Sequence, residues 1–224
     1  MEITFYDEFG TPRVYNITKD NLVGTSGSTG SVHRVSENTC LKIMDPGCSP
    51  SDVFELLKEL NVPNFVSLKD RLVSDSHTLA YTMEYAEKSD TSILHMPVEY
   101  TVDNFCSIFS SVKILTYSGI KLEDLAFRNI IVGPQRIMVV DFDSYLREAG
   151  TFFFNVDRLL ETFKALYMFA AQNDPDILCD QITLFRLVEY LFDPEGNCFD
   201  VASVISKKIS RVKKPIDLFR KVSI

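Results

Sequence analysis

The chain has 224 residues, of which 46% are hydrophobic and 17 are Phe, so it can bury the core of one domain or of two small lobes. Its formal net charge of −8 argues against nucleic acid as the main partner. No apolar run reaches the length of about 18 residues that a membrane span needs, and the acidic start lacks the order of a classical signal peptide. Five scattered cysteines without a Cys-x-x-Cys pair indicate free thiols in a reducing compartment.

A glycine-rich stretch follows residues 1–20, which are expected to form a small β element or an ordered extension. Gly24, Gly27 and Gly30 recur every third residue among Ser and Thr, with Leu22-Val23 before them and Val32 after them. Glycines let backbone N–H groups approach an anion closely, and the hydroxyl groups add donors. The stretch therefore predicts an anion-binding turn between two strands, with a flexible linker as the alternative.

A single cation interrupts the next apolar strand, residues 40–44. Burying the Lys42 ammonium is costly unless it is paired, so the sequence predicts either a specific partner for Lys42 or an edge strand that turns it to water. A helix is expected to follow up to about Asn61, capped by Ser51 or Asp52. Strands are then expected over residues 65–68, 71–74 and 79–86.

Residues 103–117 predict an amphipathic helix, capped by Asp103 at its start and ended by Gly119. A polar loop comes next, and then two short β-branched runs, 129–132 and 137–140, which predict a hairpin. Asp124, Asn129 and Asp141 lie at the ends of these runs and are expected to converge. Carboxylate and amide oxygens in that number suit Mg²⁺; a polar turn before a buried strand is the alternative.

Three more apolar helices are expected after Asp143. The first contains Val156 and is capped by Asp157 at its start, and the other two cover about 176–192 and 199–210. The basic tail, residues 207–221, is interpreted as a solvated face, with an anionic partner as the alternative.

Taken in order over residues 20–170, these motifs resemble those of the protein kinase family. The glycine-rich stretch resembles the kinase Gly-x-Gly-x-x-Gly-x-Val loop, and Met83-Glu-Tyr-Ala86 resembles the hinge. The Asp124-Leu-Ala-Phe-Arg-Asn129 segment followed by Asp141-Phe resembles the catalytic loop and metal motif. The resemblance implies an α+β fold in a single bilobal domain. Residues 1–85 would form an antiparallel sheet with one helix, and residues 86–224 a mostly helical lobe.

The resemblance also implies a site for ATP and Mg²⁺. Asp124 would orient the attacking hydroxyl, Arg128 would supply charge in the catalytic loop, and Asn129 and Asp141 would hold the metal. Met83 would be the gatekeeper, with the Glu84 carbonyl and the Ala86 N–H at the adenine edge. The glycine-rich stretch would also bind the nucleotide, through Gly24, Gly27, Ser28, Thr29, Gly30 and Val32. The loop amides and Lys42 would hold its phosphates.

The sequence departs from the family in several places. Leu122 and Glu123 stand where kinases have His and Arg, and Val53 falls where a helix Glu pairs with the strand Lys. Asp52 or Glu55 is the expected substitute. Asp143 replaces the Gly of Asp-Phe-Gly, where it could bind a second metal or repel phosphate.

The segment that follows is short and lacks Ala-Pro-Glu, so no phospho-switch is expected. Asp157 resembles the Asp that anchors the catalytic-loop backbone in kinases.

These features predict a compact, divergent protein kinase of the kind found in bacterial effectors or viruses. It would phosphorylate a hydroxyl group of a protein, and a host protein is one such expected partner. Its place would be the cytoplasm, or a host cytosol if it is secreted. A small-molecule phosphotransferase related to aminoglycoside and choline kinases is one alternative, since these also contain Asp-Phe-Asp. A pseudokinase that binds a partner is the other.

Overall fold

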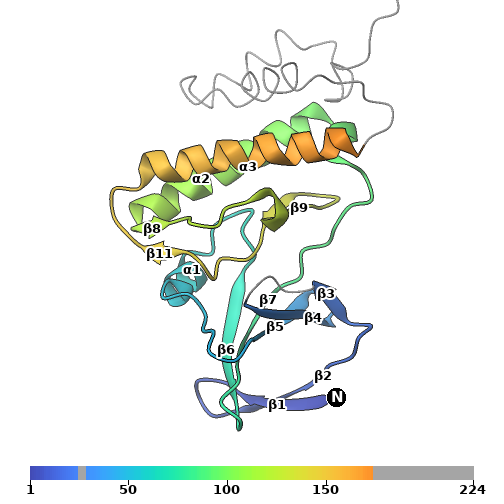
Figure 1. Ribbon diagram of the computed structural model, residues 1–224, viewed down its shortest axis with the longest axis vertical. Helices are drawn as coiled ribbons and strands as arrows, with labels where there is room; N and C mark the ends of the chain where they lie inside the picture. Colours follow the sequence, from blue (N-terminus) through green and yellow to red (C-terminus); the bar gives the residue numbers. More distant parts are fainter. Residues whose placement is uncertain (25–28, 174–224) are drawn as a thin grey trace, which may run out of the picture.

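A computed structural model describes residues 1–24 and 29–173 of the chain. The expected helices over 176–192 and 199–210, the basic tail 207–221, and Gly27 and Ser28 of the glycine-rich stretch lie outside this part. Within it, an antiparallel sheet with one helix is followed by a part dominated by two long helices (Figure 1). The predicted α+β class is confirmed.

The N-terminal part is built on one seven-stranded sheet with the order β2-β1-β6-β7-β5-β4-β3, in which every neighbouring pair is antiparallel. Its helix, α1 (Phe54–Leu60), ends at Asn61, whose left-handed backbone (φ 38°) stops the helical hydrogen bonding. The strands are β1 (Glu2–Tyr6), β2 (Pro12–Asn16), β3 (Leu22–Gly24), β4 (Gly30–Ser36), β5 (Thr39–Met44), β6 (Leu68–Ser74) and β7 (Leu79–Glu84).

The first two strands form a hairpin that extends the sheet beyond β6. Phe5 of β1 is fully buried and belongs to a small separate core with Leu41, Leu72 and Ala80. Alternation along a strand explains this packing, because Leu41 points to the face of β5 opposite its neighbour Lys42. The ordered β extension expected over residues 1–20 is therefore present.

The C-terminal part places α2 and α3 alongside one another, away from the large sheet (Figure 1). Phe105 of α2 meets Phe163 of α3 edge to face at 5.1 Å between ring centroids, inside the main core. The elements are η1 (Ile93–His95), α2 (Val98–Tyr117), β8 (Ile120–Lys121), η2 (Phe127–Asn129), β9 (Ile130–Val132), β10 (Ile137–Val139), β11 (Leu146–Arg147) and α3 (Phe152–Gln172). None of the helices in the described residues is both long and apolar enough to cross a membrane.

Three predicted helix starts are wrong. Helix α1 begins at Phe54 after Val53 and has no side-chain cap, so neither Ser51 nor Asp52 caps it. Helix α2 begins at Val98 after Pro97, so Asp103 lies inside it and caps nothing. Helix α3 begins at Phe152 after Thr151, which places Asp157 in its second turn. In α2 and α3 the strongest apolar periodicity covers only the later part of the helix, and each helix begins several residues before it.

The strand pair predicted over 65–68 and 71–74 is also different, because only β6 joins the large sheet. Phe65 instead forms a parallel bridge with Val139 of β10. Val66 N donates to the Val139 carbonyl at 3.0 Å, and Val139 N donates to the Asn64 carbonyl at 2.7 Å. These bonds fasten the β9–β10 hairpin to the chain entering β6. They fix where Asp141, just after β10, meets the N-terminal sheet.

Candidate nucleotide site

A cavity of about 450 Å³ opens between the large sheet and the β9–β10 hairpin. Strands β4, β5 and β7 provide one wall, the chain after β7 a second, and the hairpin the third. Its lining residues are Val23, Val32, Cys40, Lys42, Tyr81, Met83, Glu84, Tyr85, Ala86, Lys88, Arg128, Asn129, Ile131, Val140 and Asp141. Eight of the residues predicted for the site are among them: Val32, Lys42, Met83, Glu84, Ala86, Arg128, Asn129 and Asp141.

Lys42 lies in the interior of the sheet, since β5 is flanked by β4 and β7. It is 3% exposed, so the alternative of an edge strand facing water is wrong. Its Nζ donates to Asp141 Oδ1 at 2.7 Å and also to Asp143 Oδ2. Burial by itself lowers the pKa of Lys42, but the Asp143 and Asp141 carboxylates outweigh it, so the pKa is raised and the ammonium stays charged.

Helix α1 brings no acid to Lys42. Val53, at the position predicted for the family Glu, is fully buried in the core. Asp52 and Glu55 are both exposed, and the carboxylates that pair with Lys42 are Asp141 and Asp143. The expectation that Asp52 or Glu55 substitutes for the helix Glu is therefore wrong.

The catalytic-loop candidates form a compact polar group. Arg128 donates from one guanidinium nitrogen to both carboxylate oxygens of Asp124, at 2.5 and 2.8 Å. The Asn129 side-chain nitrogen donates to the Asp124 carbonyl at 2.9 Å. Asp124 does not line the cavity itself, but two of its contacts, Arg128 and Asn129, do.

The loop that carries Asp124 is anchored from below by Asn155, which is fully buried in α3. Asn155 Oδ1 accepts from Leu122 N at 2.8 Å, and its amide nitrogen donates to the Ile120 carbonyl and to Thr116 Oγ1, both at 2.8 Å. The sequence resemblance assigned this anchoring to Asp157, which is exposed. That assignment is wrong, and the anchor is an amide two residues earlier.

Asp141 follows β10 in a left-handed backbone conformation (φ 60°), which Asp tolerates better than most residues. Val140 N donates to the Asn129 carbonyl at 2.8 Å, so the two metal candidates are tied through the main chain. The Asn129 amide nitrogen is occupied by Asp124, which leaves its oxygen as the group able to bind a cation.

Among residues 1–24 and 29–173, no cluster of three or more His, Cys, Asp or Glu could hold a metal ion alone. One carboxylate and one amide oxygen nevertheless fit Mg²⁺, which usually takes few protein ligands and completes its shell with phosphate and water.

The end of the cavity near β7 is apolar and closed by an ion pair. Met83, Tyr85 and Ala86 line it, and the Glu84 carboxylate is paired with Arg136 of the hairpin turn. Cys40 also lines this end, and burial raises the pKa of its thiol to about 11. The thiol is therefore protonated near neutral pH and acts as an apolar wall.

The glycine-rich turn is described at its two ends. Gly24 ends β3 and Gly30 begins β4, where a Cβ would lie 2.1 Å from the Ile43 carbonyl oxygen, so only glycine fits. Thr29 is turned into the site, since its hydroxyl donates to Asp143 Oδ2 at 3.1 Å.

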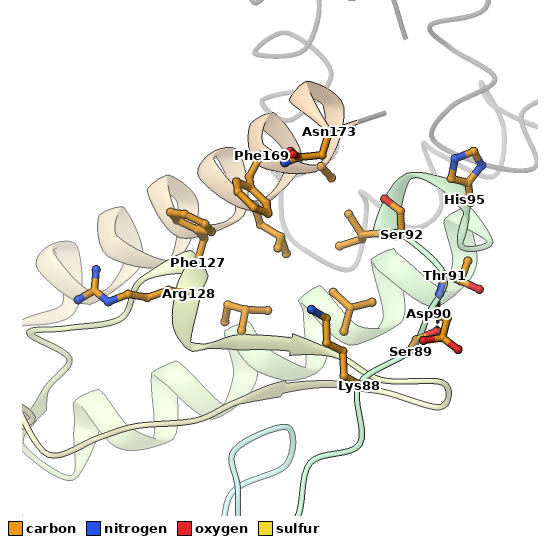
Figure 2. A pocket seen from close by; sticks show the side chains of 15 residues that line it. Lys88, Ser89, Asp90, Thr91, Ser92, His95, Phe127, Arg128, Phe169 and Asn173 are labelled. Carbon is orange, nitrogen blue, oxygen red and sulfur yellow. Dashed lines mark hydrogen bonds between the residues drawn. The ribbon is translucent and has the colours of Figure 1, made fainter. Parts of the chain in front are cut away.

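A second, larger cavity of about 730 Å³ adjoins the first and shares Lys88 and Arg128 with it. Figure 2 shows Phe127 and Phe169 facing this space from η2 and α3, and Lys88 and Ser92 from the chain that precedes α2. Its floor is apolar and its rim carries hydroxyl groups and cations. This cavity therefore reaches Arg128, one of the residues in contact with Asp124.

Several lining residues carry no motif in the sequence. Cys40 alternates with Lys42 on β5, and Tyr81 alternates with Met83 on β7, so strand periodicity places each pair on one face. That signal could have found them once the strands were known. Asp143 does not line the cavity. Its contact with Lys42 could be found only from the three-dimensional structure, because the neighbouring residues Phe142 and Ser144 do not indicate it.

No protein-family model matches the sequence, and a search of curated proteins finds no match. Among solved structures, the described fold is similar to the Mycobacterium tuberculosis PknI kinase domain (a double mutant), with a TM-score of 0.54 and 18% identity. This similarity covers 84% of the present chain and 93% of that kinase domain.

Another similar structure is the Cydia pomonella granulovirus kinase PK-1, with a TM-score of 0.44 and 18% identity over 54% of this chain and 51% of that one. The present chain thus matches only about half the length of the viral kinase. The likeness to the PknI kinase domain spans both parts of the molecule, and the chain has a compact protein kinase-like fold.

Proposed function

We propose that this protein is an ATP-dependent phosphotransferase whose nucleotide lies in the cavity between the large sheet and the β9–β10 hairpin. The observation that carries the proposal is the pair of Lys42 and Asp141, which are 99 residues apart in sequence and joined at 2.7 Å in the wall of that cavity. A buried cation beside a partly exposed carboxylate is costly to maintain. Such a pair is suited to binding a phosphate chain and a metal ion.

Each end of the cavity has a part in this proposal. Met83, Glu84 and Ala86 would receive the adenine, with Val32 covering it from β4. Lys42 and the main chain of the glycine-rich turn would hold phosphate oxygens, because Lys42 supplies a positive charge and the turn supplies backbone N–H donors.

Asn129 and Asp141 would hold Mg²⁺, which neutralises phosphate charge when bound. Asp124 would orient the attacking hydroxyl, and its carboxylate is already fixed by Arg128. Catalysis would then come from positioning and charge stabilisation, which are the main contributions in phosphoryl transfer.

We infer a protein hydroxyl as the acceptor because the larger cavity, about 730 Å³, lies beside Arg128 and has many apolar lining residues. Such a cavity suits a segment of polypeptide better than a small polar metabolite. Residues 142–151, between Asp141 and α3, contain Ser144 and Thr151 as their only hydroxyl residues besides Tyr145. Tyr145 and Thr151 are buried, so Ser144 is the one exposed hydroxyl residue of this segment, which therefore offers little room for phosphorylation control.

Transfer from [γ-³²P]ATP into a cell lysate tests this function and its acceptor class. The full chain should label proteins in the precipitated fraction, whereas a small-molecule phosphotransferase would label only the soluble low-mass fraction. Asp124→Asn should abolish the labelling, and Asp157→Asn, an exposed acid in α3, should leave it unchanged. A pseudokinase would label neither fraction, and that result would contradict the proposal.

A further inference from the structure

We propose that Asp143 is the positioning residue for Lys42 and replaces an acid on helix α1, while Asp141 is left for the metal. The part assigned to Lys42 in phosphate binding rests on the proposed function. The pairing of Lys42 with Asp143 does not, because it is a direct contact between the two side chains.

The surroundings of Asp143 hold its carboxylate in one place. Oδ2 accepts from Lys42 and from the Thr29 hydroxyl, and Oδ1 accepts from the Tyr81 hydroxyl at 3.0 Å. The Asp143 side chain is 4% exposed. Burial, with the nearby Asp143 and Asp141 carboxylates adding to it, raises the pKa of Tyr81 far above its ordinary value, so this hydroxyl remains a donor. Three donors thus fix both oxygens of Asp143.

Asp141 is placed differently although it also contacts Lys42. Its side chain is 36% exposed and lines the cavity, and its Oδ1 contact with Lys42 is the only one from that carboxylate among the bonds of the described residues. A metal ion bound to Asp141 would compete with the Lys42 contact. Asp143 does not line the cavity, so it can keep Lys42 in position when Asp141 takes another partner.

Helix α1 has no means of providing this contact, since Val53 is buried in the core and its acids are turned to solvent. The Lys42 position therefore depends on β7, through Tyr81, and on the segment just after β10, through Asp143. Among the described residues, α1 contributes no charged contact to Lys42. It reaches this group only through Phe54, whose ring packs edge to face on Tyr81 with 5.3 Å between the ring centroids.

A double-mutant cycle on the full, nucleotide-free chain tests the pairing. Asp143→Asn should lower the folding equilibrium constant by roughly a hundredfold or more in urea unfolding, because the buried Lys42 ammonium then loses its buried carboxylate partner. In a Lys42→Met background the same change should cost far less or stabilise the protein, since Asp143 is then itself unpaired. If a single variant fails to fold, the double variant, which removes both charges, remains measurable. Asp52→Asn and Glu55→Gln are the matched controls and should act additively with Lys42→Met.

A second arm separates the pairing from the function. If the wild-type chain transfers phosphate, Asp143→Asn should lower kcat about tenfold or more while the Mg²⁺ concentration needed for half-maximal rate stays the same. Asp141→Asn should raise that concentration.

Coupling in the unfolding cycle without any transfer by the wild type would leave the pairing standing and refute only the proposed function. Absence of coupling, or a Mg²⁺ requirement that rises with Asp143→Asn, would overturn the inference.

Discussion

Asn155 on helix α3 holds Leu122, which directly follows β8, with 2.8 Å between Asn155 Oδ1 and Leu122 N. The same amide donates to the Ile120 carbonyl. Asn155→Ala should destabilise the protein by about 2 kcal/mol or more, because it removes the Asn155 hydrogen bonds from the buried Leu122 N–H and Ile120 carbonyl. Urea unfolding measures this change, and phosphate transfer should fall further than stability alone explains. Asp157→Asn serves as the control, and an equal loss in it would contradict the assignment.

Gly133 lies in the turn of the β9–β10 hairpin, where the main chain leaves no room for a side chain. A Cβ there would lie 2.7 Å from the Arg136 carbonyl oxygen and 2.8 Å from that of Glu87. Because both are main-chain atoms that cannot easily move, Gly133→Ala should shift the hairpin, lower the melting temperature and weaken ATP binding. Gln135→Ala, an exposed change in the same turn, should alter neither quantity by a measurable amount.

The ion pair of Arg136 with Glu84 should matter much less. The Arg136 side chain is 51% exposed, and exposed pairs contribute at most about 1 kcal/mol. Arg136→Ala should therefore lower the free energy of unfolding by less than that amount, and added salt should reduce the difference further. If chemical denaturation shows that the free energy of unfolding falls by several kcal/mol, the ion pair holds the end of β7 to the hairpin more strongly than its exposure suggests.

His33 on β4 should make stability depend on pH. It is 7% exposed, and burial lowers its pKa below the ordinary value of 6.5. Between the folded pKa and 6.5 the unfolded chain binds more protons, so stability should rise with pH across that window and be level above it. Urea midpoints from about pH 5 to pH 8 measure the slope. His33→Gln should flatten it, whereas His77→Asn, at an exposed left-handed position, should leave it unchanged.

The sequence was informative where chemistry is local. A lone Lys in an apolar strand predicts a paired cation, and Lys42 is buried with acids around it. Its partner was not predictable, because Asp143 reaches Lys42 only through the bonds that dock the β9–β10 hairpin on the chain before β6. Pairing across 101 residues of sequence leaves no local pattern.

Asn155 is a case in which spacing along the sequence was misleading, because it indicated Asp157 as the anchor of the loop. Asp157 lies two residues further along α3, and about 100° of rotation per residue turns it to the far side of the helix. Spacing by resemblance was correct to within one turn of helix. It could not identify the face, because no capping side chain marks where α3 begins at Phe152.

The central claim is that the cavity between the sheet and the hairpin binds ATP together with Mg²⁺ at Asp141. Calorimetric titration of the full chain with ATP, in Mg²⁺ and in excess chelator, measures this directly. Wild type should bind ATP at least about tenfold more tightly with Mg²⁺, whereas Asp141→Asn, which keeps the left-handed backbone acceptable, should show little difference between the two conditions. Absence of ATP binding to the wild type, or the same Mg²⁺ effect in Asp141→Asn, would contradict the account.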